Sequence, residues 1–191
     1  MPKTCLLPPA YRVFRPPGIN MIALFNLFLD ICLLRKGPQD VPSSAALLQL
    51  SLSIYIIAGL VLLLALESQV GPALFLVLLD LGLLTGLTYG LLNMLGRGSR
   101  FGQTLTALAG TGALLQLIAW PLLGWLNQTD VQQGTATLPS LLYLALLGWN
   151  IVITGHILRH ALSTTLAFGV LYAFGYLMSF WVLSDWLVPT G

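Results

Sequence analysis

The chain has 191 residues, of which 57% are hydrophobic and only 7% are charged, and its formal net charge is +2. A soluble domain carries roughly 25% charged residues, so this composition nearly excludes a water-soluble globular protein. The eight scattered Lys and Arg residues do not form a surface that neutralises a run of phosphates, which excludes a nucleic-acid partner. The composition instead indicates an all-α polytopic membrane protein, whose helices face lipid and need no polar cover.

Residues 1–20 contain five prolines and three basic residues but no apolar stretch long enough for the core of a signal peptide. We expect this segment to be a disordered cytoplasmic tail, with no cleavable signal. The sequence becomes abruptly more regular at Met21, so a start at Met21 stays open beside a start at Met1.

Residues 21–36 predict a short amphipathic helix. Asn26 and Asp30 are four positions apart and share one face of an otherwise apolar segment, which ends before Arg35 and Lys36. The apolar part of this segment spans about 21 Å as a helix, less than the roughly 30 Å of a bilayer's hydrocarbon core. We expect the helix to lie in the membrane interface, and a position buried against the bundle is the alternative.

Five long apolar runs follow a cluster of helix-breaking residues at positions 37–44. Each run has 21 to 25 residues, which is enough to cross a bilayer with some tilt. The sequence therefore predicts a five-helix transmembrane domain over residues 45–188. Its expected spans are residues 45–66, 72–95, 104–126, 138–158 and 164–188.

All eight basic residues lie on one side of the predicted bundle, before the first span or in the loops after the second and the fourth. Lys and Arg are retained in short cytoplasmic loops, so we expect a cytoplasmic amino terminus and a carboxyl terminus outside the cytoplasm. The residues Trp120, Trp125, Trp181 and Trp186 fall near the outer boundary, where an interfacial aromatic belt would place them.

Small residues spaced by four form stripes that let another helix backbone approach closely. The stripes are Gly82, Gly86 and Gly90 in the second span, Thr165, Gly169 and Ala173 in the fifth, and the weaker pair Ala109 and Ala113 in the third. Glycine is also common in membrane helices generally, but three in register favour a packing face. We expect these stripes to form the seams between helices, with the partner helix in the same chain or in another.

Asp80 lies within the second span, where an ionised carboxylate costs about 2.5 to 3.5 kcal/mol. It should therefore face the bundle interior or water. One hypothesis makes Asp80 an ion-coupled or proton-coupled site. The other makes it a protonated acid that bonds to Gln116 or Asn150 of a neighbouring helix, and the absence of Lys and Arg from the predicted spans favours it.

His156 and His160 are four positions apart, so one metal ion could bind both, but no further ligand lies nearby in sequence. Two ligands on one helical face also cannot bind opposite faces of a haem iron. We expect these histidines to contact lipid headgroups beside Arg159. Cys5 and Cys32 indicate neither a disulfide nor a metal pair, and we expect no cofactor.

From Leu91 onward the sequence has a series of features whose order is found in a known family of membrane proteins. A helix ends at Leu95, the loop of residues 98–104 (GSRFGQT) follows, Pro121 lies late in the third span, and residues 147–162 have the sequence LGWNIVITGHILRHAL. In these features about half of the chain resembles the Yip domain family, five-helix membrane proteins named for interacting with Ypt/Rab GTPases. The resemblance implies five spans and a cytoplasmic amino terminus. The tail lacks the long acidic or polar region of eukaryotic members, so we expect a bacterial inner-membrane protein and do not transfer Rab binding.

The sequence leaves two functions open. The sequence favours a non-enzymatic membrane scaffold or interaction protein, with the lipid bilayer and a second copy or another membrane protein as partners. The alternative is a small transporter or channel subunit in which Asp80, Gln116 and Asn150 line a polar path. An odd number of spans without an internal repeat disfavours the transporter, and no catalytic motif is present to indicate an enzyme.

Overall fold

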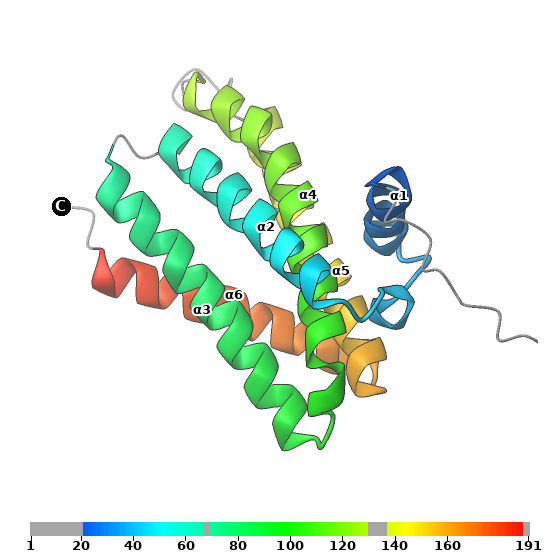
Figure 1. Cartoon of the computed structure of the whole chain (residues 1–191). Helices are drawn as coiled ribbons and strands as arrows, with labels where there is room; N and C mark the ends of the chain where they lie inside the picture. The colour runs from blue at the N-terminus through cyan, green and yellow to red at the C-terminus, as the bar shows by residue number, and fades with distance from the viewer. Residues whose placement is uncertain (1–20, 67–68, 130–136, 189–191) are drawn as a thin grey trace, which may run out of the picture.

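The computed structural model describes residues 21–66, 69–129 and 137–188, and every regular element in these ranges is a helix. Figure 1 shows α1 (Met21–Cys32), α2 (Ala45–Leu66), α3 (Val70–Met94), α4 (Phe101–Asn127), α5 (Thr137–Leu162) and α6 (Leu166–Leu187), with the 3-10 turns η1 (Pro38–Asp40) and η2 (Gly98–Arg100) between them. Helices α2 to α6 are long and apolar enough to cross a membrane, and α1 is shorter. The all-α, five-span architecture with a short first helix is therefore confirmed. The predicted tail of residues 1–20 lies outside the described residues.

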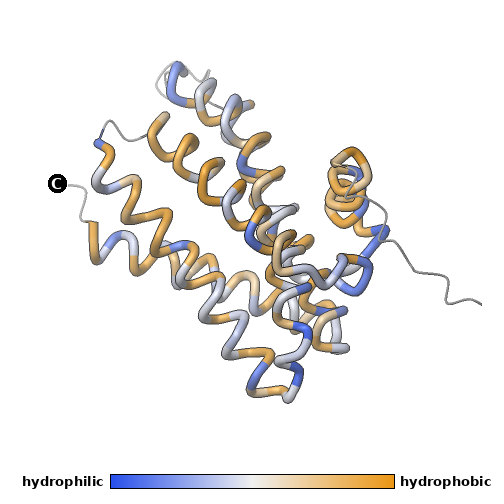
Figure 2. The backbone as a smooth tube through the Cα atoms, viewed as in Figure 1, coloured by the Kyte–Doolittle hydropathy of each residue, from blue (hydrophilic) through white to orange (hydrophobic). Residues whose placement is uncertain are grey.

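The five long helices begin and end within four residues of the expected spans. Hydrophobic residues cover these helices on nearly all sides (Figure 2), as expected for surfaces that face lipid. The largest difference is at the end of α5, which continues to Leu162. The extra turn forms because Leu158 and Leu162 are fully buried against Leu92 of α3.

Helix α4 is the central helix of the bundle. Half of the residues in its apolar 18-residue stretch are buried, against 11% in the corresponding stretch of α6. Helix α4 contacts α1, α2, α3 and α5. Small residues allow this packing: a Cβ atom on Gly110 would overlap the ring of Phe28 in α1, and one on Gly112 would lie 2.6 Å from the ring of Tyr55 in α2. Ala109 and Ala113, the stripe predicted on the third span, are both buried beside them.

Burial is concentrated at the end of the bundle that carries η1 and η2. In α4 the eight consecutive residues 104–111 are buried, whereas only Ala119 and Leu123 are buried after Leu115. The second half of α5 is likewise the buried half. Figure 1 shows α4 and α6 beginning near each other at this end and diverging toward the other. The bundle is therefore densely packed at one end and loosely packed at the opposite end.

Helices α5 and α6 cross through backbone contact at Gly155 and Gly169. A Cβ atom on Gly169 would overlap the carbonyl oxygen of Gly155 and lie 3.0 Å from its Cα atom. Ala173, one turn further along α6, is also buried. Two members of the stripe predicted on the fifth span thus lie in this seam. The third, Thr165, does not: it is exposed and caps α6, its Oγ1 accepting a hydrogen bond from the N–H of Phe168 (3.4 Å).

The glycine stripe of α3 corrects a prediction. A Cβ atom on Gly82, Gly86 or Gly90 would meet nothing within 4 Å, so no described helix packs there. The buried residues of α3 are instead Ala73, Val77, Leu84, Thr88 and Leu92. At 100° per residue, Leu84 lies about 160° around the helix from Gly86, which puts the glycines on the side turned away from the bundle. The prediction that these glycines form a seam within the chain was therefore wrong, and a seam with another chain stays a prediction.

Helix α1 packs beside the bundle, next to α4 (Figure 1). Its buried residues include Leu27 and Ile31. The indole Nε1 of Trp149 in α5 donates to the carbonyl oxygen of Cys32 (3.1 Å), which fixes the end of α1. Burial raises the pKa of the Cys32 thiol to about 11, so this thiol stays protonated at neutral pH. This contact with the bundle agrees with the alternative predicted for the segment, and the interfacial position stays a prediction, because only Leu27, Ile31 and Cys32 of α1 are buried.

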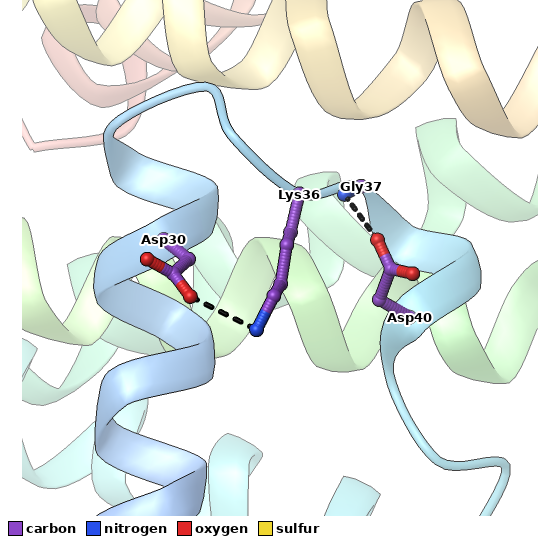
Figure 3. Close-up of polar contacts among 4 residues, drawn as sticks. All are labelled: Asp30, Lys36, Gly37 and Asp40. Atoms are coloured by element: carbon purple, nitrogen blue, oxygen red, sulfur yellow. Dashed lines mark hydrogen bonds and ion pairs between the residues drawn. The ribbon is translucent and has the colours of Figure 1, made fainter.

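The outward surface of α1 has an apolar side and a narrow polar stripe. The exposed apolar residues are Met21, Ile22, Phe25 and Leu29. The stripe is formed by Asn26 and Asp30, and Asp30 pairs with Lys36 (2.9 Å) across the turn that follows, as Figure 3 shows. In the same turn the carboxylate of Asp40 accepts a hydrogen bond from the N–H of Gly37 (2.9 Å). A helix with this surface fits the membrane interface, its stripe toward water and its apolar side toward acyl chains.

Replacing Gly169 with Ala should force α5 and α6 apart, because the new methyl group would overlap the backbone of Gly155, which cannot rotate away. Overpacking costs about 1–3 kcal/mol, so we expect a loss of at least this size in the free energy of unfolding. The measurement is the unfolding midpoint of the purified protein in detergent. Gly175→Ala, on the same helix with open space around the new Cβ, is the control. Equal midpoints for the two variants would contradict the close crossing.

Candidate functional site

A cavity of about 160 Å³ lies inside the bundle, and all five spanning helices line it. Its polar lining residues are Tyr55 of α2, Thr88 of α3, Gln116 of α4, Tyr143, Asn150 and Thr154 of α5, and Tyr172 and Tyr176 of α6. Tyr55, Asn150 and Tyr176 each fall close to the midpoint of their helix. One water molecule needs about 10–15 Å³, so the cavity admits several waters or one small solute.

Asp80 of α3 lies behind two of these lining residues. The hydroxyl of Tyr55 donates a hydrogen bond to one carboxylate oxygen of Asp80, and the hydroxyl of Tyr176 donates to the other. Both tyrosines also line the cavity, whereas Asp80 itself does not. The carboxylate thus joins α2, α3 and α6, and it acts on the cavity through two tyrosine side chains.

Glycine residues of α4 and α2 make room for this arrangement. The ring of Tyr55 lies on Gly112, where any side chain would displace it. Gly59 of α2 similarly leaves space for the amide of Gln116, whose Nε2 atom would lie 3.3 Å from a Cβ atom at that position. The sequence therefore accommodates two of the bulky polar groups, Tyr55 and Gln116, by pairing each with a glycine on the facing helix.

Gln116 and Asn150, the partners predicted for Asp80, do not bond to it; its carboxylate oxygens accept hydrogen bonds from the two tyrosine hydroxyls instead. Both residues line the same cavity. The Oε1 atom of Gln116 is buried and has no hydrogen-bond partner among the described residues. Two residues of the predicted polar site thus share one cavity, whereas Asp80 lies behind its wall, and the predicted bonds among the three are not formed.

Sequence reasoning missed the tyrosines of the cavity. Tyrosine in a membrane protein is usually assigned to the interface, where its ring and hydroxyl meet different surroundings. Tyr55 and Tyr176 lie instead near the middle of their spans, too far from either interface for the hydroxyl to reach water. That position was the available signal, because a mid-span hydroxyl needs a polar partner inside the bundle.

The cavity contains no basic lining residue. Arginines lie instead in the turns at the densely packed end, where they hold the end of α5. Arg97 donates to the Oγ of Ser163 (2.5 Å), and a guanidinium nitrogen of Arg100 donates to the carbonyl oxygen of Ala161 (3.2 Å). Among the described residues, the hydrogen bonds of Asp80 come from tyrosines, and the side chains that line the cavity are not basic.

The histidine pair does not meet lipid headgroups as a unit. His156 is only 8% exposed, and its Nε2 atom lies 3.1 Å from the carbonyl oxygen of Lys36, which corrects the headgroup contact predicted for it. The ring of His160 packs edge-on against that of His156, with the centroids 4.6 Å apart. The physical reason is the turn after α1, whose carbonyl groups need donors once the helix has ended.

Comparison with known proteins found no match: no family model, no curated protein and no solved structure is significantly similar to the chain. The resemblance to the Yip domain family stays a prediction from the order of sequence features. The site must therefore be interpreted from its own chemistry.

Proposed function

We propose that the bundle binds a small polar solute in its central cavity and works as a small transporter or channel subunit. The observation that carries this proposal is the polar lining contributed by all five spanning helices, with the Oε1 atom of Gln116 buried and unpartnered. A buried polar group without a partner costs about 1–3 kcal/mol. A bundle that served only as a scaffold would be more stable with an apolar residue at this position, whereas a bound solute can supply the missing partner.

The position of the site supports the same function. Ionisable residues within membrane helices commonly mark ion or substrate pathways, and transporter sites typically lie near the bilayer midplane. Asp80 belongs to α3 and Tyr176 to α6. Only 17% and 11% of the residues in the apolar 18-residue stretches of these two helices are buried. Loosely packed helices move at lower cost than the central α4. The hydrogen bonds of Asp80 therefore lie where a conformational change could open and close the cavity.

The proposed location is a bacterial inner membrane, with the amino terminus in the cytoplasm and the carboxyl terminus in the periplasm. Support comes from Arg97 and Arg100, which lie together at the densely packed end, since basic residues are retained on the cytoplasmic side. In this orientation the dense packing separates the cavity from the cytoplasm. A solute would enter from the periplasmic side, where the helices spread.

Cysteine labelling tests whether aqueous solutes reach the cavity. In a chain whose Cys5 and Cys32 are replaced by Ser and Ala, Asn150→Cys should react with a small, charged thiol reagent about tenfold or more faster than Leu144→Cys. Leu144 lies on the same helix but is 61% exposed on the outer surface, where lipid would keep its thiol protonated and unreactive. The measurement is the labelling rate in membrane vesicles. Equal rates at the two positions would contradict a solute pathway through the cavity.

A second function, a scaffold or interaction protein, is favoured by one observation. The stripe of Gly82, Gly86 and Gly90 faces outward with open space around it, which suits close approach by a helix of a second copy or of another membrane protein.

If this stripe is an interface between copies, Gly86→Ile should abolish the crosslinked dimer in membranes while leaving the unfolding midpoint of the monomer unchanged, because a Cβ atom at this position has open space around it within the chain. Leu78→Ile is the control, since Leu78 is 53% exposed on the same helix. Leu84, on the opposite side of the helix from Gly86, is not a suitable control position, because it is buried in the bundle. A dimer that survives in Gly86→Ile would show that this face does not join two copies.

A further inference from the structure

We infer that the cavity selects a small organic cation, an ammonium or quaternary ammonium group, over neutral and anionic solutes. This inference rests on the proposed solute-binding function and names the class of solute. Three features of the described residues support it: the direction of the hydrogen bonds at Asp80, the charge of the lining, and the aromatic rings around the cavity.

The hydrogen bonds at Asp80 leave acceptors facing the cavity. A tyrosine hydroxyl has one O–H to donate, and Tyr55 and Tyr176 both donate theirs to the carboxylate. Each hydroxyl oxygen can therefore offer only lone pairs to a solute in the cavity. Gln116 adds a buried Oε1 acceptor that has no partner among the described residues. A solute that meets the hydroxyl oxygens bonded to Asp80 must donate hydrogen bonds or carry positive charge, while Asn150, Tyr143 and Tyr172 line the cavity with groups that can also donate.

The charge of the lining favours a cation over a neutral donor. No Lys, Arg or His among the described residues lines the cavity, and the carboxylate of Asp80 lies behind its wall, bonded to two lining tyrosines. When it is ionised, this carboxylate attracts a positive charge strongly, because its surroundings have a low dielectric constant. The two tyrosine hydroxyls relay this polarity to the cavity surface, since each is polarised by the carboxylate that it bonds to.

The aromatic rings favour an organic cation over a bare metal ion. Tyr55, Tyr143, Tyr172 and Tyr176 line the cavity together with several leucines. Aromatic faces attract ammonium groups and accept their methyl substituents, whereas hard metal ions need a full shell of oxygen ligands. A space of about 160 Å³ accommodates one small ammonium compound of this kind.

The test compares choline with 3,3-dimethyl-1-butanol, its uncharged carbon isostere, as probes for the full chain in lipid nanodiscs. We expect choline to bind about tenfold or more tightly than the isostere, measured as the ratio of the two dissociation constants by equilibrium dialysis. Asp80→Asn, which keeps the size of the side chain but removes its charge, should bring this ratio close to one. Tyr89→Phe, at an exposed position on the same helix, should keep the wild-type ratio.

The outcomes separate the cation inference from the proposed function. Equal binding of the two probes to the wild-type chain would overturn cation selection and leave a polar solute site in place. Binding of neither probe, nor of acetate or glycerol, would overturn both. If Asp80→Asn does not fold, Tyr176→Phe replaces it, because this variant keeps the ring and removes one acceptor oxygen. A wild-type probe ratio in Tyr176→Phe would then contradict the role assigned to the hydroxyl.

Discussion

The hydrogen bonds of Asp80 to Tyr55 and Tyr176 determine how the bundle is arranged. Inside a membrane no water can satisfy a carboxylate, so its partners must come from neighbouring helices. At 100° per residue Asp80 lies about 120° around α3 from Gly86. Turning the carboxylate toward its partners therefore turns the glycine stripe outward. The same bonds bring α2 and α6 to α3, so the central cavity forms beside them.

Glycines at helix crossings let the other helices accommodate this polar centre. Gly112 gives the Tyr55 ring a flat surface on α4, and the crossing of Gly155 with Gly169 brings α6 close to α5. These contacts lie in or beside the densely packed half of α4 and α5, while α3 and α6 are mostly exposed to lipid. The result is a central, well-buried helix and two peripheral helices, α3 and α6, that carry Asp80 and Tyr176. Such a division allows the cavity to change shape without unfolding the core.

The sequence predicted the number of spans and their approximate ends, because apolar length and interrupting turns are local properties of the chain. It could not show which side of α3 faces inward. Hydrophobic residues surround a lipid-exposed helix, so hydropathy has no direction, and the glycine stripe favoured the wrong side. Gln116 and Asn150 line one cavity, but the bonds predicted between them and Asp80 are not formed. The bonds from Tyr55 and Tyr176 join helices far apart in sequence, and no local pattern encodes them.

A double-mutant cycle between Asp80 and Tyr176 tests most directly whether these hydrogen bonds hold the bundle together. Tyr176→Phe removes only the hydroxyl, and Asp80→Leu removes the acceptor, so the unfolding free energies of the wild type, the single variants and the double variant give the interaction energy. We expect an interaction energy of about 1–2 kcal/mol, with Tyr176→Phe nearly neutral once Asp80 is replaced. Tyr176→Phe with the same cost in both backgrounds would show that the two groups do not interact, and the polar centre described here would be wrong.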